Sequence, residues 1–483
     1  MALSLLCSLL LGQLAGAQPL VIKRVTVIDA TGKPAQPDMT VVIDRDRIAA
    51  VSPWKKAKIP KNAQVVDGTG KFLIPGLWDM HVHGFAGLGG FIGAEDSQPA
   101  QTYLLYLANG VLGVRDMFGP PNAKEWRAQH ASSDKPAPSV FLGSPIVDGP
   151  QPTWPGSIAV ADEAQGRDAV AQQKERGADF IKVYSLLSRD AYFAIADEAR
   201  TRGIPFAGHV PQRVTAAEAS DAGQKSMEHL LQVAEGCSSK EEAILAAQPT
   251  MEEMAAIRAA VNAGRIPTMP RIPPNADDTY DEAKAQALFA RFVKNGTWQC
   301  PTLTVIRMRT QLNDPQFVND SRLKYMTKSV RSGWDPKNNG PLRLGMTAEG
   351  SAFARRRFSE ALLMVGRMHR AGVSILAGSD VMNPYVFPGF SLHDELALLV
   401  EAGMPPMAAL QAATSNAARF MGQLDRRETI ETGKVADLVL LDKDPLADIH
   451  NTRSIQAVVL HGRLMPRAAL DAMLVEAEAL ANK

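Results

Sequence analysis

Eight short apolar segments recur through the middle of this 483-residue chain, and stretches of helical composition separate them. Strands that alternate with helices in this way are typical of a parallel sheet covered by helices. Eight parallel strands are the number that closes a TIM (β/α)8 barrel. The segments are residues 76–83, 111–117, 139–147, 179–185, 205–210, 226–230, 297–305 and 373–380. The sequence therefore predicts an α/β fold built around a TIM barrel.

The two ends of the chain have a different character. Residues 18–74 and 425–483 contain short alternating runs with Gly, Pro and Asp between them, which is typical of antiparallel strands. We expect both ends to complete one sheet and to form a small β-sandwich domain, followed by a C-terminal helix. Residues 75–424 then form the barrel domain. Within it, the long helical stretch 237–295 and the polar, irregular stretch 312–351 are predicted to be loop insertions that could cover the site.

The composition points to a small-molecule partner. Lys plus Arg number 52 and Asp plus Glu number 51, so no excess of positive charge favours a nucleic acid or an anionic membrane. No later segment reaches the roughly 18 consecutive apolar residues of a membrane span. Assembly of the chain into a homo-oligomer is compatible with this composition.

The first 17 residues are predicted to be a signal peptide. They hold an apolar run and end in Ala15-Gly16-Ala17, a small-residue pattern that precedes cleavage sites. The alternative is a buried N-terminal helix. Cleavage places the mature protein in the periplasm or outside the cell. It leaves Cys237 and Cys300, for which we favour free thiols over a disulfide.

Four of the nine histidines fall at the carboxyl ends of predicted strands. His81 and His83 are two residues apart in one strand, so their side chains share a face. His209 and His229 end two later strands. A lone histidine is more often a core residue, but active sites of TIM barrels are built at this end, and neighbouring imidazoles suit zinc.

Lys182 is predicted to point into the barrel, because Ile181 and Val183 on either side of it form the face that meets helices. A buried ammonium is costly and cannot bind a cation. A deprotonated lysine can instead take up carbon dioxide and become a carbamate, whose two oxygens can bridge two metal ions. The alternative is an ion pair with Asp380.

Asp380 ends the last predicted strand, after the small residues of Ala377-Gly378-Ser379. A carboxylate at that rim can bind a metal ion and also accept a proton as the catalytic base. The alternative role is the N-cap of the next helix.

These residues lie in segments that together resemble the amidohydrolase superfamily over nearly the whole mature chain. The segments are Pro75-Gly76-Leu77-Trp78-Asp79-Met80-His81-Val82-His83, Ile181-Lys182-Val183, Gly208-His209-Val210, Glu228-His229-Leu230, Ala377-Gly378-Ser379-Asp380 and Gly433-Lys434-Val435-Ala436-Asp437-Leu438-Val439. Within the superfamily they look like the imidazolonepropionase-like branch with a carboxylated lysine, which includes prolidase-like dipeptidases, acyl-amino-acid hydrolases and ochratoxinase.

The resemblance implies two divalent metal ions, with zinc expected. His81, His83 and Asp380 would hold one, His209 and His229 the other, and carboxylated Lys182 would bridge them. The chain departs from the family pattern after this lysine, where Val183-Tyr184-Ser185 replaces a glycine-rich turn. The predicted function is hydrolysis of an amide bond in a dipeptide or N-acyl amino acid, with a hydroxide held by the metals as the attacking group.

Two other functions are compatible with these residues. The same metals could open a cyclic amide or cleave an ester, lactone or phosphotriester, since one fold hosts many reactions. A non-enzymatic binding protein with a degenerate site is the third, against which the intact ligand set argues. Three further residues are candidates for substrate contact. Tyr184 shares the face of Lys182, Trp154 could wall the pocket, and Arg115 could bind substrate or form a structural ion pair with Asp116, which we favour.

Overall fold

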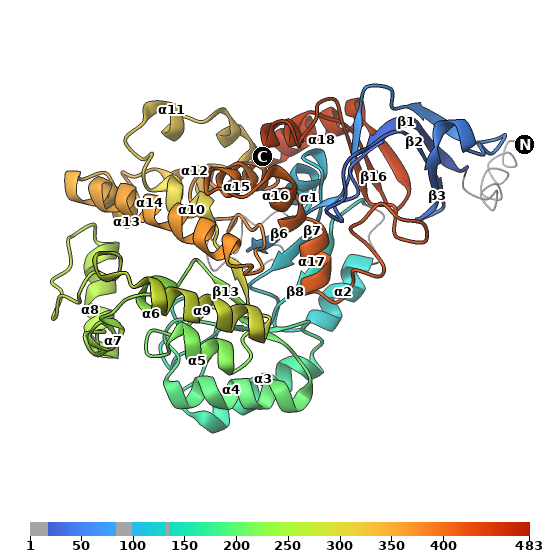
Figure 1. The fold of residues 1–483 in the computed structure, drawn as a ribbon. Helices are drawn as coiled ribbons and strands as arrows, with labels where there is room; N and C mark the ends of the chain where they lie inside the picture. The colour runs from blue at the N-terminus through green and yellow to red at the C-terminus, as the bar shows by residue number, and fades with distance from the viewer. Residues whose placement is uncertain (1–17, 84–98, 132–134) are drawn as a thin grey trace, which may run out of the picture.

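The computed structural model describes residues 18–83, 99–131 and 135–483 (Figure 1). The predicted signal peptide, residues 1–17, lies outside the described residues. The chain alternates strands and helices through its middle, so the predicted α/β class is confirmed. Among the described residues, no helix combines the length and the apolar character that crossing a bilayer requires.

The two chain ends share one eight-stranded sheet, as predicted. Its strands pair in the order β17-β16-β15-β5-β1-β2-β3, with β4 beside β1, so the C-terminal strands continue the N-terminal ones (Figure 1). The sheet is mixed rather than antiparallel, because β1 pairs in parallel with β4 and β5. A second layer, which a sandwich needs, stays a prediction. The strands are β1 (Leu20–Val27), β2 (Gln36–Asp44), β3 (Arg47–Pro53), β4 (Gln64–Asp67), β5 (Phe72–Pro75), β15 (Leu438–Leu441), β16 (Ile455–Leu460) and β17 (Arg463–Pro466).

The central strands form two parallel sheets. One has three strands in the order β6-β7-β8, and the other has six in the order β10-β9-β11-β12-β13-β14. Every pair within them is parallel. The strands are β6 (Leu77–Val82), β7 (Val111–Asp116), β8 (Ser139–Leu142), β9 (Val147–Asp148), β10 (Ile158–Ala159), β11 (Ile181–Val183), β12 (Phe206–Gly208), β13 (Ser226–Glu228) and β14 (Trp298–Cys300).

Three isolated parallel bridges connect the central strands with one another and with the last predicted strand. Gly143 pairs with Phe180 between the two sheets. Ile375 pairs with Gln299 after β14, and Val381 pairs with Val82 at the end of β6. Within residues 373–380, predicted as the eighth strand, the carbonyl oxygen of Ala377 also accepts from the N–H of Met80 in β6 at 2.9 Å. The segment therefore contacts both neighbouring strands without forming a regular strand of its own.

Proline interrupts two other predicted strands. Residues 139–147 divide into β8 and β9, because Pro145 between them has no backbone N–H to offer a neighbouring strand. Residues 297–305 are a strand only to Cys300. Pro301 and Thr302, whose φ is +49°, end the strand, and the next residue begins helix α10 (Leu303–Met308).

The helices bury the outer faces of the central strands. Ile181 and Val183 of β11 are fully buried in a hydrophobic cluster with Tyr192 and Ile195 of α4, so the predicted helix-facing side of this strand is confirmed. The helices that follow or flank the central strands are α1 (Pro99–Ala108), α2 (Ala123–Ala131), α3 (Glu163–Glu175), α4 (Arg189–Arg202), α5 (Ala216–Asp221), α6 (Val233–Gly236), α15 (Phe390–Glu401), α16 (Pro406–Ala412), α17 (Ser415–Phe420) and α18 (Arg467–Ala481).

The two predicted insertions are both helical in the structure. The first has the helical character expected from its composition. The second was predicted to be irregular, but it forms short helices because its scattered apolar residues have a core of their own. Trp334 and Leu342 are buried there in a cluster with Tyr385 and Phe387. The helices are α7 (Glu241–Ala246), α8 (Met251–Asn262), α9 (Glu282–Asn295), α11 (Pro315–Val318), α12 (Lys328–Trp334), α13 (Gly340–Gly345) and the long α14 (Ala348–Arg370).

Candidate functional site

His81 and His83 lie together at the carboxyl end of β6. His81 is fully buried and His83 nearly so, and their Nε2 atoms are 3.3 Å apart. Gly378 allows the chain before Asp380 to approach them, since a Cβ there would lie 2.7 Å from the Cβ of His81. The two imidazoles therefore present their Nε2 atoms to one point, as the sequence predicted from their spacing.

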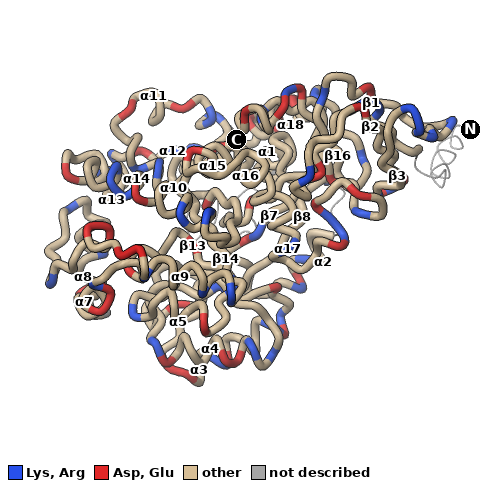
Figure 2. The backbone as a smooth tube through the Cα atoms, in the orientation of Figure 1, with Lys and Arg blue, Asp and Glu red and all other residues tan. Residues whose placement is uncertain are grey.

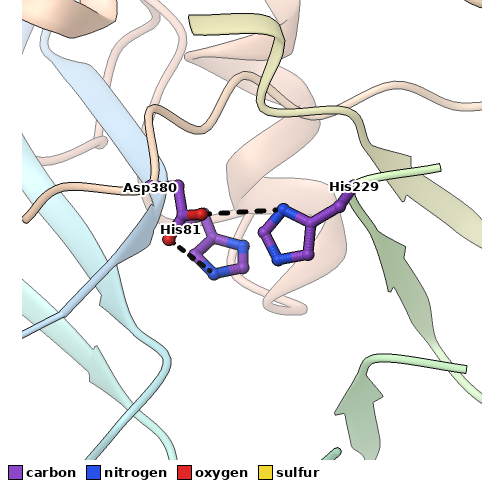
Figure 3. Close-up of side chains that lie close together, drawn as sticks. All are labelled: His81, His229 and Asp380. Carbon is purple, nitrogen blue, oxygen red and sulfur yellow. Dashed lines mark ion pairs between the residues drawn. The ribbon is translucent and has the colours of Figure 1, made fainter. Parts of the chain in front are cut away.

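Asp380 lies within ion-pair distance of both His81 and His229 (Figure 3). Its Oδ1 lies 3.0 Å from Nε2 of His83 and 3.4 Å from Nε2 of His81, and its Oδ2 lies 3.7 Å from Nδ1 of His229. Its backbone has a φ of +60°, which turns the side chain inward at the end of residues 373–380. It does not serve as the N-cap of any described helix.

His209 and His229 form the other half of the cluster. Their ring centroids are 4.8 Å apart, and the ring of His229 lies 4.7 Å from that of His81. Each has a hydroxyl 2.7 Å from its Nδ1: Ser185 at His209 and Thr302 at His229. Such partners fix ring orientation and tautomer, which leaves Nε2 as the outward nitrogen.

Lys182 lies close to the histidines. It is fully buried, and its Nζ has no hydrogen-bond partner among the described residues. Burial lowers its pKa to about 8. Gly208 of β12 leaves room for this side chain, because a Cβ there would lie 3.0 Å from the Cδ of Lys182 and 2.2 Å from the carbonyl oxygen of Val183. The alternative role of Lys182, an ion pair with Asp380, lacks the direct contact that it requires.

The protonation states in this cluster suit a metal site. Burial lowers the pKa of His81 and of His209 well below the usual range, and lowers that of His229 to about 4. Burial alone would raise the pKa of Asp380, but the neighbouring histidines outweigh it and hold that pKa below its ordinary value. Neutral imidazoles and an ionised carboxylate are the forms that bind metal ions.

Two buried carboxylates support the cluster, and sequence reasoning missed both. Glu228 lies 2.8 Å from Nδ1 of His81. Asp79 accepts hydrogen bonds from the backbone N–H groups of His81, at 3.2 Å, and of Ser379, at 2.9 Å. Asp79 thus ties β6 to the segment that carries Asp380. Its place two residues before His81 in the strand was a usable signal, since it shares the face of the histidines.

Arg115 forms a structural ion pair, the role that the sequence analysis favours, but with a different partner. It is fully buried and donates to both oxygens of Glu228, at 3.0 and 2.9 Å, and to the hydroxyl of Ser226 at 2.8 Å. It therefore lies behind His81 as a structural residue rather than as a substrate contact, and its partner is Glu228 instead of Asp116. A β-strand directs successive side chains to opposite faces, which makes the adjacent Asp116 a poor partner.

A second group of side chains is less suited to hold a metal ion. His81, Glu228 and Cys300 lie close enough together to hold an ion. Arg115 already neutralises Glu228, and burial raises the pKa of the Cys300 thiol well above its usual range, so this sulfur stays protonated. Both Cys237 and Cys300 are buried and free, as the favoured interpretation predicted.

A cavity of about 1070 Å³ opens above the cluster. His83, His209, His229 and Asp380 line it, and so do Trp154 and Tyr184. The indole Nε1 of Trp154 donates to the hydroxyl of Tyr184 at 2.8 Å, and the Tyr184 ring stacks on His209 with centroids 3.8 Å apart. Both aromatic residues therefore form part of the cavity wall next to the cluster.

Comparison with known proteins identifies the family of this chain. Residues 72–465 match the model of the amidohydrolase family. A curated relative, N-acetylglucosamine-6-phosphate deacetylase of Lysinibacillus sphaericus, is 37% identical over 67 residues, which are 14% of this chain and 16% of that protein. The chain therefore matches only about a sixth of the length of this relative.

Solved structures share the fold along nearly the whole chain. The structure of a bottromycin amidohydrolase matches with a TM-score of 0.68 and 24% identity, covering 95% of this chain and 90% of that one. A Xaa-Pro dipeptidase with bound methionine matches with a TM-score of 0.64 and 19% identity, covering 93% of this chain and 100% of that one. Because the family model spans most of the sequence, the chain belongs to the amidohydrolase family.

Proposed function

We propose that the chain is a metal-dependent hydrolase that cleaves the amide bond of a dipeptide or an N-acyl amino acid. One observation carries the proposal: four histidines, an aspartate and a buried lysine without a hydrogen-bond partner lie together, and His83, His209, His229 and Asp380 of this set line one large cavity. The names of the structural neighbours support an amide substrate, since they include an amidohydrolase and a Xaa-Pro dipeptidase.

The donor set fits two divalent ions, with zinc as the expected metal. His81, His83 and Asp380 would hold one ion, and His209 and His229 the other. The amine of Lys182 would add carbon dioxide, lose a proton and become a carbamate that bridges both. This assignment gives the buried nitrogen a role, and it places the chain in the branch of the family with a carboxylated lysine.

The bound ions would supply a water whose pKa is lowered toward about 7 and would polarise the carbonyl oxygen of the substrate. Asp380 lines the cavity, and the neighbouring histidines hold its pKa below the ordinary value, so its carboxylate would accept a proton from the attacking water and return it to the leaving nitrogen. Tyr184 accepts the Trp154 N–H, which leaves its own hydroxyl proton to donate to a substrate oxygen.

We also propose how the barrel and the terminal sheet are built. The bridges from Ile375 to β14 and from Val381 to β6 support a closed eight-stranded barrel over residues 75–424. Side chains from β2 and from β15, which are far apart in the sheet order, belong to one hydrophobic cluster, and this supports a sheet folded into a sandwich. The helices at 237–295 and 312–351 would then be insertions above the site. The apolar first 17 residues support export.

Metal content tests the site. We expect about two divalent ions per chain in the purified full-length protein and a sharp loss in Lys182→Ala. One ion, unchanged by this substitution, would indicate a mononuclear site in which Lys182 does not bridge. Amide hydrolysis is then measured with N-acyl amino acids and dipeptides, and with lactones and phosphotriesters as the competing classes.

Asp380→Asn tests the proposed base. The amide keeps the size of the side chain but cannot accept the proton, so we expect kcat to fall by about 100-fold or more. A variant that keeps both metals and full turnover would exclude Asp380 from proton transfer.

A further inference from the structure

Glu395 of α15 is a carboxylate in the interior of the protein. The charged residues of outer helices such as α3 and α4 lie where solvent reaches them (Figure 2), whereas Glu395 is fully buried. Removing a carboxylate from water costs free energy unless hydrogen bonds replace the lost hydration. The bonds that do so here come from α10, against which α15 packs.

Glu395 provides the N-terminal cap of α10. Its Oε1 accepts from the N–H of Leu303 at 2.9 Å, and its Oε2 accepts from the N–H and from the hydroxyl of Thr304, both at 2.8 Å. Leu303 and Thr304 are the first two residues of the helix, so their N–H groups have no partner within it. A side chain from another helix therefore satisfies the first turn of α10.

Thr302 occupies the N-cap position of α10, but its side chain does not cap the helix. A threonine at this position usually turns its hydroxyl to an N–H of the first turn. Here the hydroxyl donates to the carbonyl oxygen of Pro301 at 2.8 Å and lies 2.7 Å from Nδ1 of His229. Because its one proton is used by Pro301, the hydroxyl accepts the proton of Nδ1 and leaves Nε2 of the neutral ring free to bind a metal ion. The cap from Glu395 thus releases Thr302 to orient His229.

Thr304 connects the same carboxylate to the segment that carries Asp380. Its hydroxyl is shared between Oε2 of Glu395, at 2.8 Å, and the carbonyl oxygen of Ser379, at 3.1 Å. That carbonyl belongs to the peptide that leads into Asp380, and Asp79 accepts from the N–H of Ser379 at 2.9 Å. Asp380 has a φ of +60°, which persists in a residue other than glycine when the surroundings hold it. The contacts at both ends of Ser379 therefore hold the turn that directs Asp380 to the histidines.

We propose that Glu395 is a positioning residue that sets the separation of His229 and Asp380, whose Nδ1 and Oδ2 atoms are 3.7 Å apart. The inference rests on the proposed function, in which these two residues bind different metal ions. One connection runs through Thr302 to His229. The other runs through Thr304 to Asp380. Glu395 thereby controls the geometry of both proposed metal positions without contacting either ligand.

The tautomer of His229 provides a readout that does not depend on metal. In metal-free full-length protein that contains nitrogen-15-labelled histidine, NMR distinguishes a ring protonated at Nδ1 from one protonated at Nε2, and His229→Asn assigns the signal. We expect the Nδ1 form in the wild type. In Glu395→Gln the amide nitrogen cannot accept from a backbone N–H, so Thr302 should turn its hydroxyl to α10 and the two tautomers of His229 should mix. An unchanged signal in Glu395→Gln would overturn the proposal.

Metal binding tests the two connections separately. Zinc affinity, from competition with a chelator, should fall by about 10- to 100-fold in Glu395→Gln. Thr304→Val removes only the hydroxyl next to Ser379, so it should change the visible spectrum of the cobalt-substituted protein, which reports ligand geometry, and leave the tautomer of His229 as it is. An unchanged cobalt spectrum in Thr304→Val would overturn the connection to Asp380.

Asp394→Asn is the matched control. Asp394 precedes Glu395 on α15 and is also mostly buried, but its partners are Arg307, Arg322 and Arg453, none of which lines the cavity. This variant should lose stability, while the tautomer of His229, the zinc affinity and the cobalt spectrum stay as in the wild type. The same changes in Asp394→Asn as in Glu395→Gln would reflect a general loss of stability and would overturn the proposal.

The outcomes also separate this inference from the proposed function. A wild type that binds two ions and hydrolyses amides, together with a Glu395→Gln variant of unchanged tautomer and zinc affinity, would reject the positioning role and keep the function. A wild type that binds no metal, together with a tautomer of His229 that depends on Glu395, would keep the control of His229 and reject the proposed function.

Discussion

Glu228 lies 2.8 Å from Nδ1 of His81, and both side chains are fully buried. The same carboxylate is held by Arg115 through two hydrogen bonds. His81 therefore has one nitrogen fixed from behind and presents the other to Asp380 and His83. In metal sites such an outer carboxylate orients the ligand and raises its basicity.

Glu228→Gln is expected to have two effects. It leaves the Arg115 charge buried without its partner, which should lower the free energy of unfolding by about 3–5 kcal/mol. It also weakens the bond to His81, which should lower metal affinity by about 10- to 100-fold. Urea unfolding of the metal-free protein and zinc competition with a chelator measure the two effects separately.

The double variant Arg115→Met/Glu228→Gln separates these effects further. It removes both buried charges, so most of the lost stability should return while the metal affinity remains low. If Glu228→Gln alone binds zinc as tightly as the wild type, Glu228 has only a structural role.

The sequence could predict the positions of the proposed metal ligands because each depends on local periodicity. His81 and His83 share a face in any strand, and Lys182 opposes Ile181 and Val183 in the same way. The ends of strands depend on less regular signals. Pro301 and the left-handed Thr302 stop β14 early, although apolar residues continue into α10.

Contacts between distant elements could not be predicted from the sequence. Arg115 meets Glu228, which lies 113 residues further along the chain, and only the arrangement of β7 beside the other central strands brings them together. Glu395 meets Leu303, 92 residues before it, because α15 packs on α10. The apolar residues in 312–351 are too widely spaced to reveal that Trp334 and Leu342 complete a common core.

Lys182→Met should have opposite effects on stability and on metal binding. The buried Nζ has no hydrogen-bond partner among the described residues, so replacing it with an apolar chain of similar length should stabilise the metal-free protein by about 1–3 kcal/mol. The same change should abolish most metal binding. Lys225→Met is the control, because Lys225 is partly buried and directs its Nζ toward the ring of Phe420. Lower stability of metal-free Lys182→Met would show that the amine has a favourable partner.

Ser185→Ala and Thr302→Val should each weaken the site through a histidine. Each removes the hydroxyl 2.7 Å from the Nδ1 of His209 or His229, so the ring loses its fixed orientation. Metal affinity should fall by about 10- to 100-fold, and stability by about 1 kcal/mol. Ser188→Ala is the control: Ser188 caps α4, and its loss should cost about 1 kcal/mol with metal affinity unchanged. Unchanged zinc affinity in both test variants would show that packing alone orients the rings.

Glu428→Gln should alter how stability depends on pH. Glu428 is buried, accepts a hydrogen bond from Trp78 Nε1 at 2.8 Å, and has a second carboxylate oxygen without a hydrogen-bond partner among the described residues. Burial, helped by the charge of Asp437, raises its pKa from 4.5 to about 8. The folded protein therefore holds this proton more tightly than the unfolded chain does.

The resulting stability is complete below pH 4.5 and is lost as the pH rises through about 8. Between these values the wild type should lose up to about 1.4 kcal/mol per pH unit that Glu428→Gln does not lose. Urea unfolding of both metal-free proteins from pH 5 to pH 9 measures the difference. It should grow in favour of the variant up to about pH 8 and then level off. Parallel stability curves across this range would mean that Glu428 titrates normally, and that its buried oxygen has access to water.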